Sequence, residues 1–167
     1  MSQVVERVLS FDPAPAIARG FERGALKEHV RFQAYATIPD FFDQPDPKRC
    51  TCGCGRELTG RQRRWAENDC SAFGLAVLRI LKCDADVIRY YLSEQRGAGC
   101  QHCGVMNEPL QVDHIVPVHK GGGGRWLDNY QLLCECCHKQ KTAEDRRRPS
   151  TKSGERGRAS RRLSLGG

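Results

Sequence analysis

Residues 100–142, CQHCGVMNEPLQVDHIVPVHKGGGGRWLDNYQLLCECCHKQKT, decide the fold of this chain. Two Cys-x-x-Cys pairs, separated by 30 residues, mark the stretch: Cys100/Cys103 and Cys134/Cys137. Four thiols at this spacing indicate one structural zinc ion, because zinc in such sites takes four tetrahedral ligands. The separation exceeds the roughly 15–20 residues of a simple zinc ribbon, which predicts that the insert is a folded unit held together at its base.

The insert reads as strand, loop, strand and helix. Its β-branched and apolar residues predict strands over 110–116 and 130–133, and Pro117 ends the first of them. Residues 119–125 are rich in glycine and predict a flexible loop. A helix is expected over 137–147. Three basic side chains are expected on its exposed side: Lys139, Lys141 and Arg146.

A carboxylate and two imidazoles form a second group of candidate metal ligands. The predicted order of elements would place Asp113 and His114 beside the first turn of the helix that carries His138. Oxygen and nitrogen donors at one place suggest a reactive metal, distinct from the zinc of the cysteines. The alternative is that both histidines are ordinary strand and helix residues near a zinc knuckle.

A second cysteine cluster lies upstream. Cys50, Cys52 and Cys54 form a Cys-x-Cys-x-Cys run that, with Gly53 and Gly55, gives a flexible loop able to wrap one ion, and Cys70 could close the tetrahedron. The alternatives are that only three of them bind metal, or that they are free thiols. A basic run beside an aromatic residue lies in between: Arg61, Arg63, Arg64 and Trp65. This run could contact phosphates and stack on a base, or it could be a solvated turn.

The composition limits the size of the core and the compartment. A length of 167 residues allows one compact domain or two very small ones. The hydrophobic fraction is only 39%, and such chains are often stabilised by metals or disulfides. We see no signal peptide and no segment long enough to span a membrane. We therefore expect a cytoplasmic protein whose paired cysteines bind metal; disulfides would require secretion by a route hidden in the sequence.

The net charge of +7 belongs to the C-terminus. Residues 146–167 hold eight Lys/Arg and one acid, whereas residues 1–145 hold 19 basic and 19 acidic residues. The segment after Arg148 has almost no apolar residues, which predicts a disordered tail. A cationic tail predicts non-specific, salt-sensitive affinity for a phosphate backbone.

The motifs of the stretch resemble a known family. D-H-I-V-P, G-G, L-x-N-x-Q-L-L-C and C-H-x-x-K-T follow in the order and spacing of the HNH endonucleases, the ββα-metal nucleases with a four-cysteine zinc support. The resemblance covers residues 100–142. Upstream, C-x-C-G-C-G and G-R-Q-R-R-W look like a small cysteine cluster that precedes some bacterial and phage HNH domains.

The resemblance implies an endonuclease site. Asp113 and His138 would hold a divalent cation, and His114 would be the general base that deprotonates the attacking water. Asn129 would tie the loop so that His114 keeps its orientation. A phosphodiester repels nucleophiles, so a cation must neutralise the developing charge and stabilise the leaving oxygen. Availability favours Mg²⁺, with Mn²⁺, Ni²⁺ or Zn²⁺ as alternatives, because a mixed oxygen and nitrogen site selects no single metal.

The implied function is hydrolysis of DNA, with double-stranded DNA as the expected substrate and 5′-phosphate and 3′-hydroxyl ends as products. Lys141 could contact a substrate phosphate or simply face solvent. One alternative is a non-catalytic, zinc-stabilised nucleic-acid-binding or packaging factor on an HNH scaffold, which would have no chemical need for all four site residues. Another is a zinc-bound protein-interaction module without DNA affinity, against which the basic tail argues.

We expect an α+β fold: a small zinc-stabilised HNH domain preceded by a cysteine-rich knuckle and two helices. Residues 69–82 read as a buried helix, and the second helix begins at Asp84 or Asp86 and stops at Gly97. The expected segments are a helical arm with a proline-rich linker (1–48), the knuckle with its helices (49–97), the HNH domain (98–146) and the basic tail (147–167).

Overall fold

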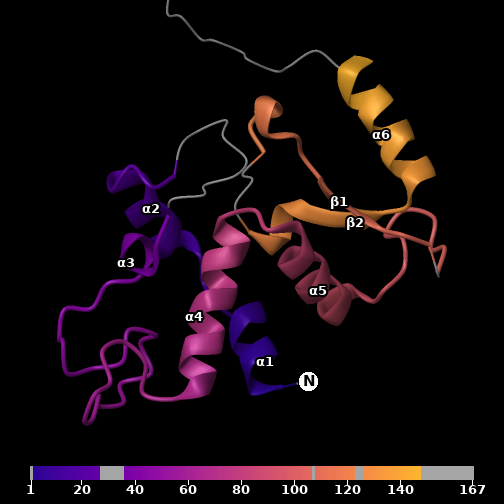
Figure 1. Cartoon of the computed structure of the whole chain (residues 1–167). Helices are drawn as coiled ribbons and strands as arrows, with labels where there is room; N and C mark the ends of the chain where they lie inside the picture. The colour runs from indigo at the N-terminus through magenta and orange to yellow at the C-terminus, as the bar shows by residue number, and fades with distance from the viewer. Residues whose placement is uncertain (1, 27–35, 107, 123–125, 148–167) are drawn as a thin grey trace, which may run out of the picture.

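The computed structural model of the chain describes residues 2–26, 36–106, 108–122 and 126–147. The basic tail expected to be disordered, apart from Arg147, and part of the predicted glycine-rich loop lie outside these residues. Figure 1 shows the described elements from the N-terminal helices to α6. None of the described helices is both long and apolar enough to cross a bilayer.

In the described residues, three short helices precede the first cysteine cluster: α1 (Gln3–Leu9), α2 (Ala14–Glu22) and α3 (Ile38–Phe41). The Ser2 hydroxyl caps α1 by accepting the Val5 N–H at 3.4 Å. α1 packs against α4 and α5, and α2 packs against α3. The sequence predicts only a loosely helical arm and a linker here, whereas the structure buries these helices as part of the main core.

Two longer helices, α4 (Asn68–Leu81) and α5 (Ala85–Arg96), confirm the helices predicted from the sequence. The Asp84 carboxylate caps α5 by accepting the Val87 N–H at 3.3 Å. Gly97 ends α5 with a φ of +88°, a conformation that glycine adopts without steric cost. These caps fix the angle at which the chain enters and leaves α5.

β1 (Gln111–His114) and β2 (Tyr130–Leu133) form a two-stranded antiparallel sheet within the predicted strand segments. α6 (Glu135–Arg147) begins two residues before the predicted start, which places Cys137 and His138 in its first turn. The strands lie between α5 and α6 in Figure 1, and both helices contact both strands. The described fold is therefore the predicted mixture of helices and a small sheet.

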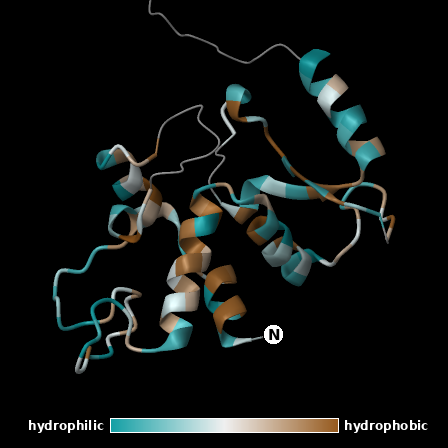
Figure 2. Cartoon of the chain, viewed as in Figure 1, coloured by the Kyte–Doolittle hydropathy of each residue, from teal (hydrophilic) through white to brown (hydrophobic). Residues whose placement is uncertain are grey.

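The molecule has an apolar core and a separate cysteine-rich core. The apolar core joins α1, α4 and α5 to β2 and includes Val8, Val77, Ile80, Leu92 and Leu132. The smaller core consists of Leu133 with three cysteines. Figure 2 shows apolar residues concentrated on α1 and α4, whereas α6 is largely hydrophilic and its one buried residue is Cys137. α6 lacks an apolar face to hold it, so its attachment depends on the cysteines.

Candidate active site and metal centres

A C-terminal tetrad is assembled as the sequence predicts, from Cys100, Cys103, Cys134 and Cys137. Its sulfur atoms all lie within 4.8 Å of one another. The Gly104 N–H donates to the Cys100 carbonyl at 2.8 Å and closes the knuckle. The Gln101 N–H donates to the Leu132 carbonyl at 2.8 Å, which ties the knuckle to β2. The tetrad could hold one zinc ion at the base of the sheet and of α6.

The charges around the C-terminal tetrad favour a bound cation. Burial opposes ionisation of the Cys100 thiol, but surrounding backbone N–H groups, first that of Cys103, outweigh burial and lower its pKa to about 6. Burial raises the pKa of Cys137 well above the ordinary value of a thiol. One sulfur is thus prepared as a thiolate while another resists ionisation, so a divalent cation would be needed for all four to bind as thiolates.

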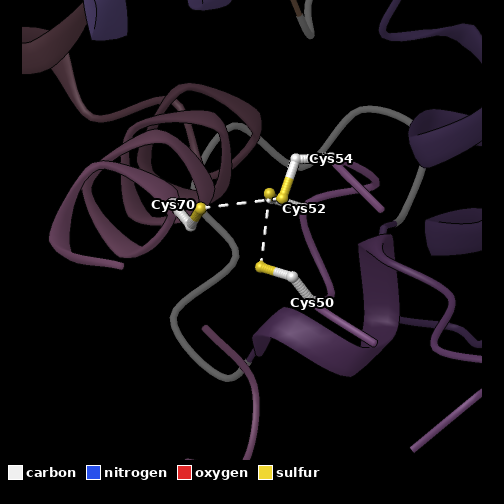
Figure 3. A group of neighbouring side chains, drawn as sticks. All are labelled: Cys50, Cys52, Cys54 and Cys70. Atoms are coloured by element: carbon white, nitrogen blue, oxygen red, sulfur yellow. Dashed lines mark hydrogen bonds between the residues drawn. The ribbon is translucent and has the colours of Figure 1, made fainter. Parts of the chain in front are cut away.

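An N-terminal tetrad is formed by Cys50, Cys52, Cys54 and Cys70, and its sulfurs also lie within 4.8 Å of one another. Figure 3 shows the loop cysteines turned toward Cys70, which lies in the first turn of α4. The Sγ atoms of Cys54 and Cys70 are 3.9 Å apart. All four cysteines come together, rather than three, so this tetrad could hold a second zinc ion.

Two arginines lie against the N-terminal tetrad. The Arg56 guanidinium donates to Cys70 Sγ at 3.6 Å and pairs with Glu67 at 2.8 Å. Burial would lower the pKa of Arg7, but its hydrogen bonds and attraction to Cys52 and Cys70 outweigh burial and raise it. These guanidinium groups balance the negative charge that four thiolates around one zinc ion would carry.

Asp113 and His138 face each other across the gap between β1 and α6. Asp113 Oδ1 lies 3.7 Å from His138 Nε2. Two donor atoms about 2.1 Å from one cation must lie no more than about 4.2 Å apart, so the pair fits a shared ion. Among the described residues, groups of three or more candidate ligands occur only at the cysteine tetrads, so a cation here would keep several positions open.

The second carboxylate oxygen of Asp113 is held by protein partners. Lys141 Nζ lies 3.0 Å from Asp113 Oδ2, and Gln131 Nε2 donates to the same oxygen at 3.1 Å. Lys141 is only 21% exposed, so the expectation that it lies on the exposed side of the helix is wrong. The partners of Oδ2 leave Oδ1 directed at His138, as the outer partners of metal-binding carboxylates usually do.

Lys141 belongs to an ion-pair network that the sequence analysis missed. Its ammonium lies 2.6 Å from Asp145 Oδ2, and Lys120 Nζ lies 3.3 Å from Asp145 Oδ1. Burial would raise the pKa of Asp145, but Lys141 and then Lys120 outweigh burial and lower it. The i,i+4 spacing of Lys141 and Asp145 is visible in the sequence, but it does not show that the pair faces Asp113.

His114 and Asn129 lie at the open end of the sheet. Side chains of neighbouring strand residues point to opposite faces; accordingly, Asp113 contacts α6 while the His114 ring packs 4.6 Å from the ring of Tyr130. His114 is 6% exposed. The Asn129 side chain accepts the Val116 N–H at 2.9 Å and donates to the Val116 carbonyl at 3.0 Å. Asn129 thus ties down the segment that leaves β1 directly after His114.

The other histidines of the nuclease part, its fifth cysteine and Trp65 lie outside this site. His119 and Cys136 are exposed, and exposed His102 has its Nδ1 3.4 Å from Cys137 Sγ. Trp65 packs on α4, where a Cβ added at Gly74 would lie 2.2 Å from the indole. The structure therefore does not support the interpretation of Trp65 as a base-stacking residue.

Comparison with known proteins gives one family match and a few relatives. The model of the family described as HNH endonuclease matches residues 100–144. A "Probable HNH endonuclease" of Lactococcus phage SK1 is 35% identical over 66 residues, covering 36% of this chain and 70% of the phage protein. The "DNA annealing helicase and endonuclease ZRANB3" is 62% identical over 34 residues in Mus musculus and 64% over 33 in Homo sapiens. The match covers 20% of this chain but 3% of either mammalian protein. No solved structure matches the chain.

Proposed function

The chain belongs to the HNH endonuclease family, and we propose on this premise that it is a metal-dependent endonuclease that hydrolyses phosphodiester bonds of double-stranded DNA. The observation that carries the proposal is the pair of donor atoms, Asp113 Oδ1 and His138 Nε2, held 3.7 Å apart. Such an enzyme would act inside the cell, in the cytoplasm, in association with DNA.

Asp113 and His138 would hold the divalent cation. A cation bound to them supplies charge neutralisation for the phosphate and stabilises the leaving 3′ oxygen. Mg²⁺ is the first choice by availability, and Mn²⁺, Ni²⁺ and Zn²⁺ suit the same donors. Gln131 and Lys141 support the site by keeping Asp113 Oδ2 occupied, so that one carboxylate oxygen remains for the ion.

His114 would accept the proton of the attacking water. A neutral imidazole is suited to this step near neutral pH, and a correctly placed base contributes roughly 10²–10⁴ in rate. Asn129 would be a positioning residue, because its two hydrogen bonds to Val116 fix the backbone that follows His114. Since His114 is 6% exposed, the proposal requires that water reach its ring in the DNA complex.

Lys141 would be the phosphate contact of the site. Its ammonium lies beside Asp113 and is 21% exposed, close to where a phosphate bound by the cation would carry its charge. Asp145 holds this ammonium at 2.6 Å. With a cation bound to Asp113 and His138, the arrangement would offer two positive charges, the cation and the ammonium, to one anionic substrate group.

The second candidate function is a non-catalytic nucleic-acid-binding or packaging factor on the same scaffold. The burial of His114 favours it, because a general base must meet the water that it deprotonates. The presence of Asp113, His114, Asn129 and His138 together favours the enzyme, because binding alone needs no such set.

Plasmid cleavage with Mg²⁺ or Mn²⁺ distinguishes the two functions. We expect the wild-type protein to cut, and His114→Ala to lose roughly 10²–10⁴ of the rate. His119→Ala, which changes an exposed histidine nearby, should cut like the wild type. Zinc content and circular dichroism should be equal in all three proteins. Equal cutting by His114→Ala would refute the assigned base, and DNA binding without cutting by the wild type would favour the second candidate.

A further inference from the structure

The loop of residues 48–67, which contains three cysteines of the N-terminal tetrad, carries positive charges that have no role in the proposed active site. Arg61, Arg63 and Arg64 are all exposed, and we call them the arginine edge. Within the described residues the arginine edge forms no ion pair, although Arg49 pairs with Glu57 and Arg56 with Glu67 in the same loop. Three guanidinium groups within four residues thus remain available to an anion.

The backbone that carries the arginine edge is fixed by hydrogen bonds. The Thr51 N–H donates to the Arg64 carbonyl at 2.8 Å. Gln62 spans the turn, since its Oε1 accepts the Thr59 N–H at 2.8 Å and its Nε2 donates to the Ala66 carbonyl at 2.8 Å. A surface with a fixed backbone loses less conformational entropy on binding than a mobile one.

Trp65 anchors the end of the arginine edge on the apolar core. Its indole packs on α4 at Gly74 and lies 6.4 Å from the ring of Phe42. The aromatic residue of the basic run is therefore the anchor on the core, while the arginines before it face solvent. The loop therefore presents exposed arginines on a hydrogen-bonded backbone, and Trp65 is not available to stack on a base.

The described nuclease part, residues 100–147, offers few free cations: Arg146 and Arg147 at the end of α6 are exposed and form no ion pair among the described residues, whereas the lysines are paired. The described residues of 100–147 include five Lys/Arg and six Asp/Glu. Lys120, Lys139 and Lys141 all form ion pairs within the same part. Four thiolates with one zinc ion would add further negative charge. A polyanionic substrate must therefore be attracted largely from elsewhere in the molecule.

We infer that the arginine edge is a second contact surface for the backbone phosphates of DNA, away from the scissile phosphate. The inference takes the nucleic-acid substrate of the proposed function as its starting point. The planar fork of arginine matches phosphate oxygens and reads no base sequence from them. The edge increases affinity for any duplex, and zinc bound at the N-terminal tetrad would hold the loop in place.

The test is DNA binding by fluorescence anisotropy on a labelled duplex, without added divalent cation. We expect the triple variant Arg61→Gln/Arg63→Gln/Arg64→Gln to bind roughly tenfold more weakly or worse, with its salt slope reduced by about 0.9 for each phosphate that the edge no longer neutralises. The matched variant Arg61→Lys/Arg63→Lys/Arg64→Lys keeps the positive charges. It should retain most of the DNA affinity and most of the salt slope. Zinc content equal to the wild type shows that the loop is intact.

Unchanged affinity and salt slope in the glutamine variant would overturn the inference and leave an acidic protein as the partner of the edge. Failure of the proposed function gives a different result. In that case His114→Ala would cut plasmid like the wild type, while the glutamine variant would still bind DNA more weakly.

Discussion

The N-terminal and C-terminal parts of the molecule each contain a cysteine tetrad, but the tetrads stand in different surroundings. The N-terminal tetrad borders the apolar core: Cys52 packs against it, and Cys70 is fully buried on α4, the helix that supplies Phe73 to it. The C-terminal tetrad borders only the small core around Leu133, and α6 has no buried residue other than Cys137. Zinc bound to four cysteines would therefore reinforce an existing core in one part and replace a missing one in the other.

The tetrads also differ in how their negative charge is balanced. Backbone N–H groups of the knuckle lower the pKa of Cys100 in the C-terminal tetrad. Guanidinium groups from Arg7 and Arg56 approach the N-terminal tetrad from α1 and from the loop itself. Zinc at the N-terminal tetrad would thus also help to fix α1, which belongs to the apolar core in any case. Substitutions in the two parts should consequently have unequal effects.

The largest effect is expected from Cys134→Ser. Structural zinc sites contribute about 10–16 kcal/mol of apparent binding free energy, comparable with the whole stability of a small domain. The variant should lose one zinc per chain, the order of α6 and all DNA cutting. Metal analysis, circular dichroism and plasmid cleavage measure these three. Cys136→Ser, which changes an exposed thiol two residues away, should lose none of them. A Cys134→Ser protein that keeps both zincs would contradict the assigned ligands.

Cys54→Ser should have a smaller effect, although it also removes one zinc per chain. The apolar core of α1, α4 and α5 does not depend on this metal, so unfolding should stay cooperative with a lower melting temperature. Plasmid cutting should persist at saturating enzyme, because the cation site lies in the other part. Differential scanning calorimetry provides the measurement, with Cys83→Ser as a control thiol outside both tetrads. Loss of the cooperative transition would show that both parts depend on metal alike.

Asp145→Asn should weaken cation binding at the proposed site of Asp113 and His138 without touching either tetrad. Lys141 would then keep Asp113 as its remaining strong carboxylate partner and would compete with the cation for it. We expect Mn²⁺ to bind about tenfold more weakly, the scale typical of outer partners of metal ligands. Calorimetric titration of the zinc-loaded protein measures this affinity. Glu144→Gln alters the exposed neighbouring acid and should bind Mn²⁺ like the wild type. Equal affinity in both variants would remove Asp145 from the site.

The smallest effect is expected from Asp84→Asn in the apolar part. Burial would raise the pKa of Asp84, but the hydrogen bond from Arg79 and the backbone of α5 outweigh burial and lower it. A lowered folded-state pKa stabilises the protein above the ordinary carboxyl pKa, and this stabilisation disappears as the pH falls through the folded value. The variant should be less stable than the wild type by under about 1 kcal/mol at pH 7, with the gap closing below about pH 4. Urea unfolding of the variant and the wild type at pH 7 and below about pH 4 tests this. A stability difference that stays the same at the two pH values would contradict it.

The sequence predicts the elements that depend on local signals. The paired cysteines, the strands and α5 with its Asp84 cap and Gly97 stop all follow from spacing and residue type within a short window. The assignment of Asp113 and His138 as cation ligands comes from the family motif, and both this assignment and the catalytic roles stay predictions. The division of the chain into four segments also stays a prediction.

The features that the sequence does not predict depend on contacts between distant residues. Phe11 lies 5.5 Å from the rings of both Phe73 and Trp126, which joins the N-terminal residues to the nuclease part. Phe11 follows α1, and the hydrophobic pattern of so short a segment does not predict such a contact. Likewise, Lys141 looks like a solvated lysine until the packing of α6 against β1 brings it to Asp113. The direction of a side chain across an interface is set by the tertiary fold, and the sequence pattern alone does not predict that packing.

The positions of the two tryptophans give each part of the molecule an optical signal of its own. Trp65 directly precedes Ala66, whose N–H donates to Cys50 Sγ at 3.4 Å, so its indole emission should follow metal loading at the N-terminal tetrad. Trp126 is 8% exposed beside Phe11, just before the chain enters β2, so its emission should follow assembly of the nuclease part. With Trp65→Phe and Trp126→Phe proteins, intrinsic fluorescence during a zinc titration could resolve the order in which the two tetrads fill.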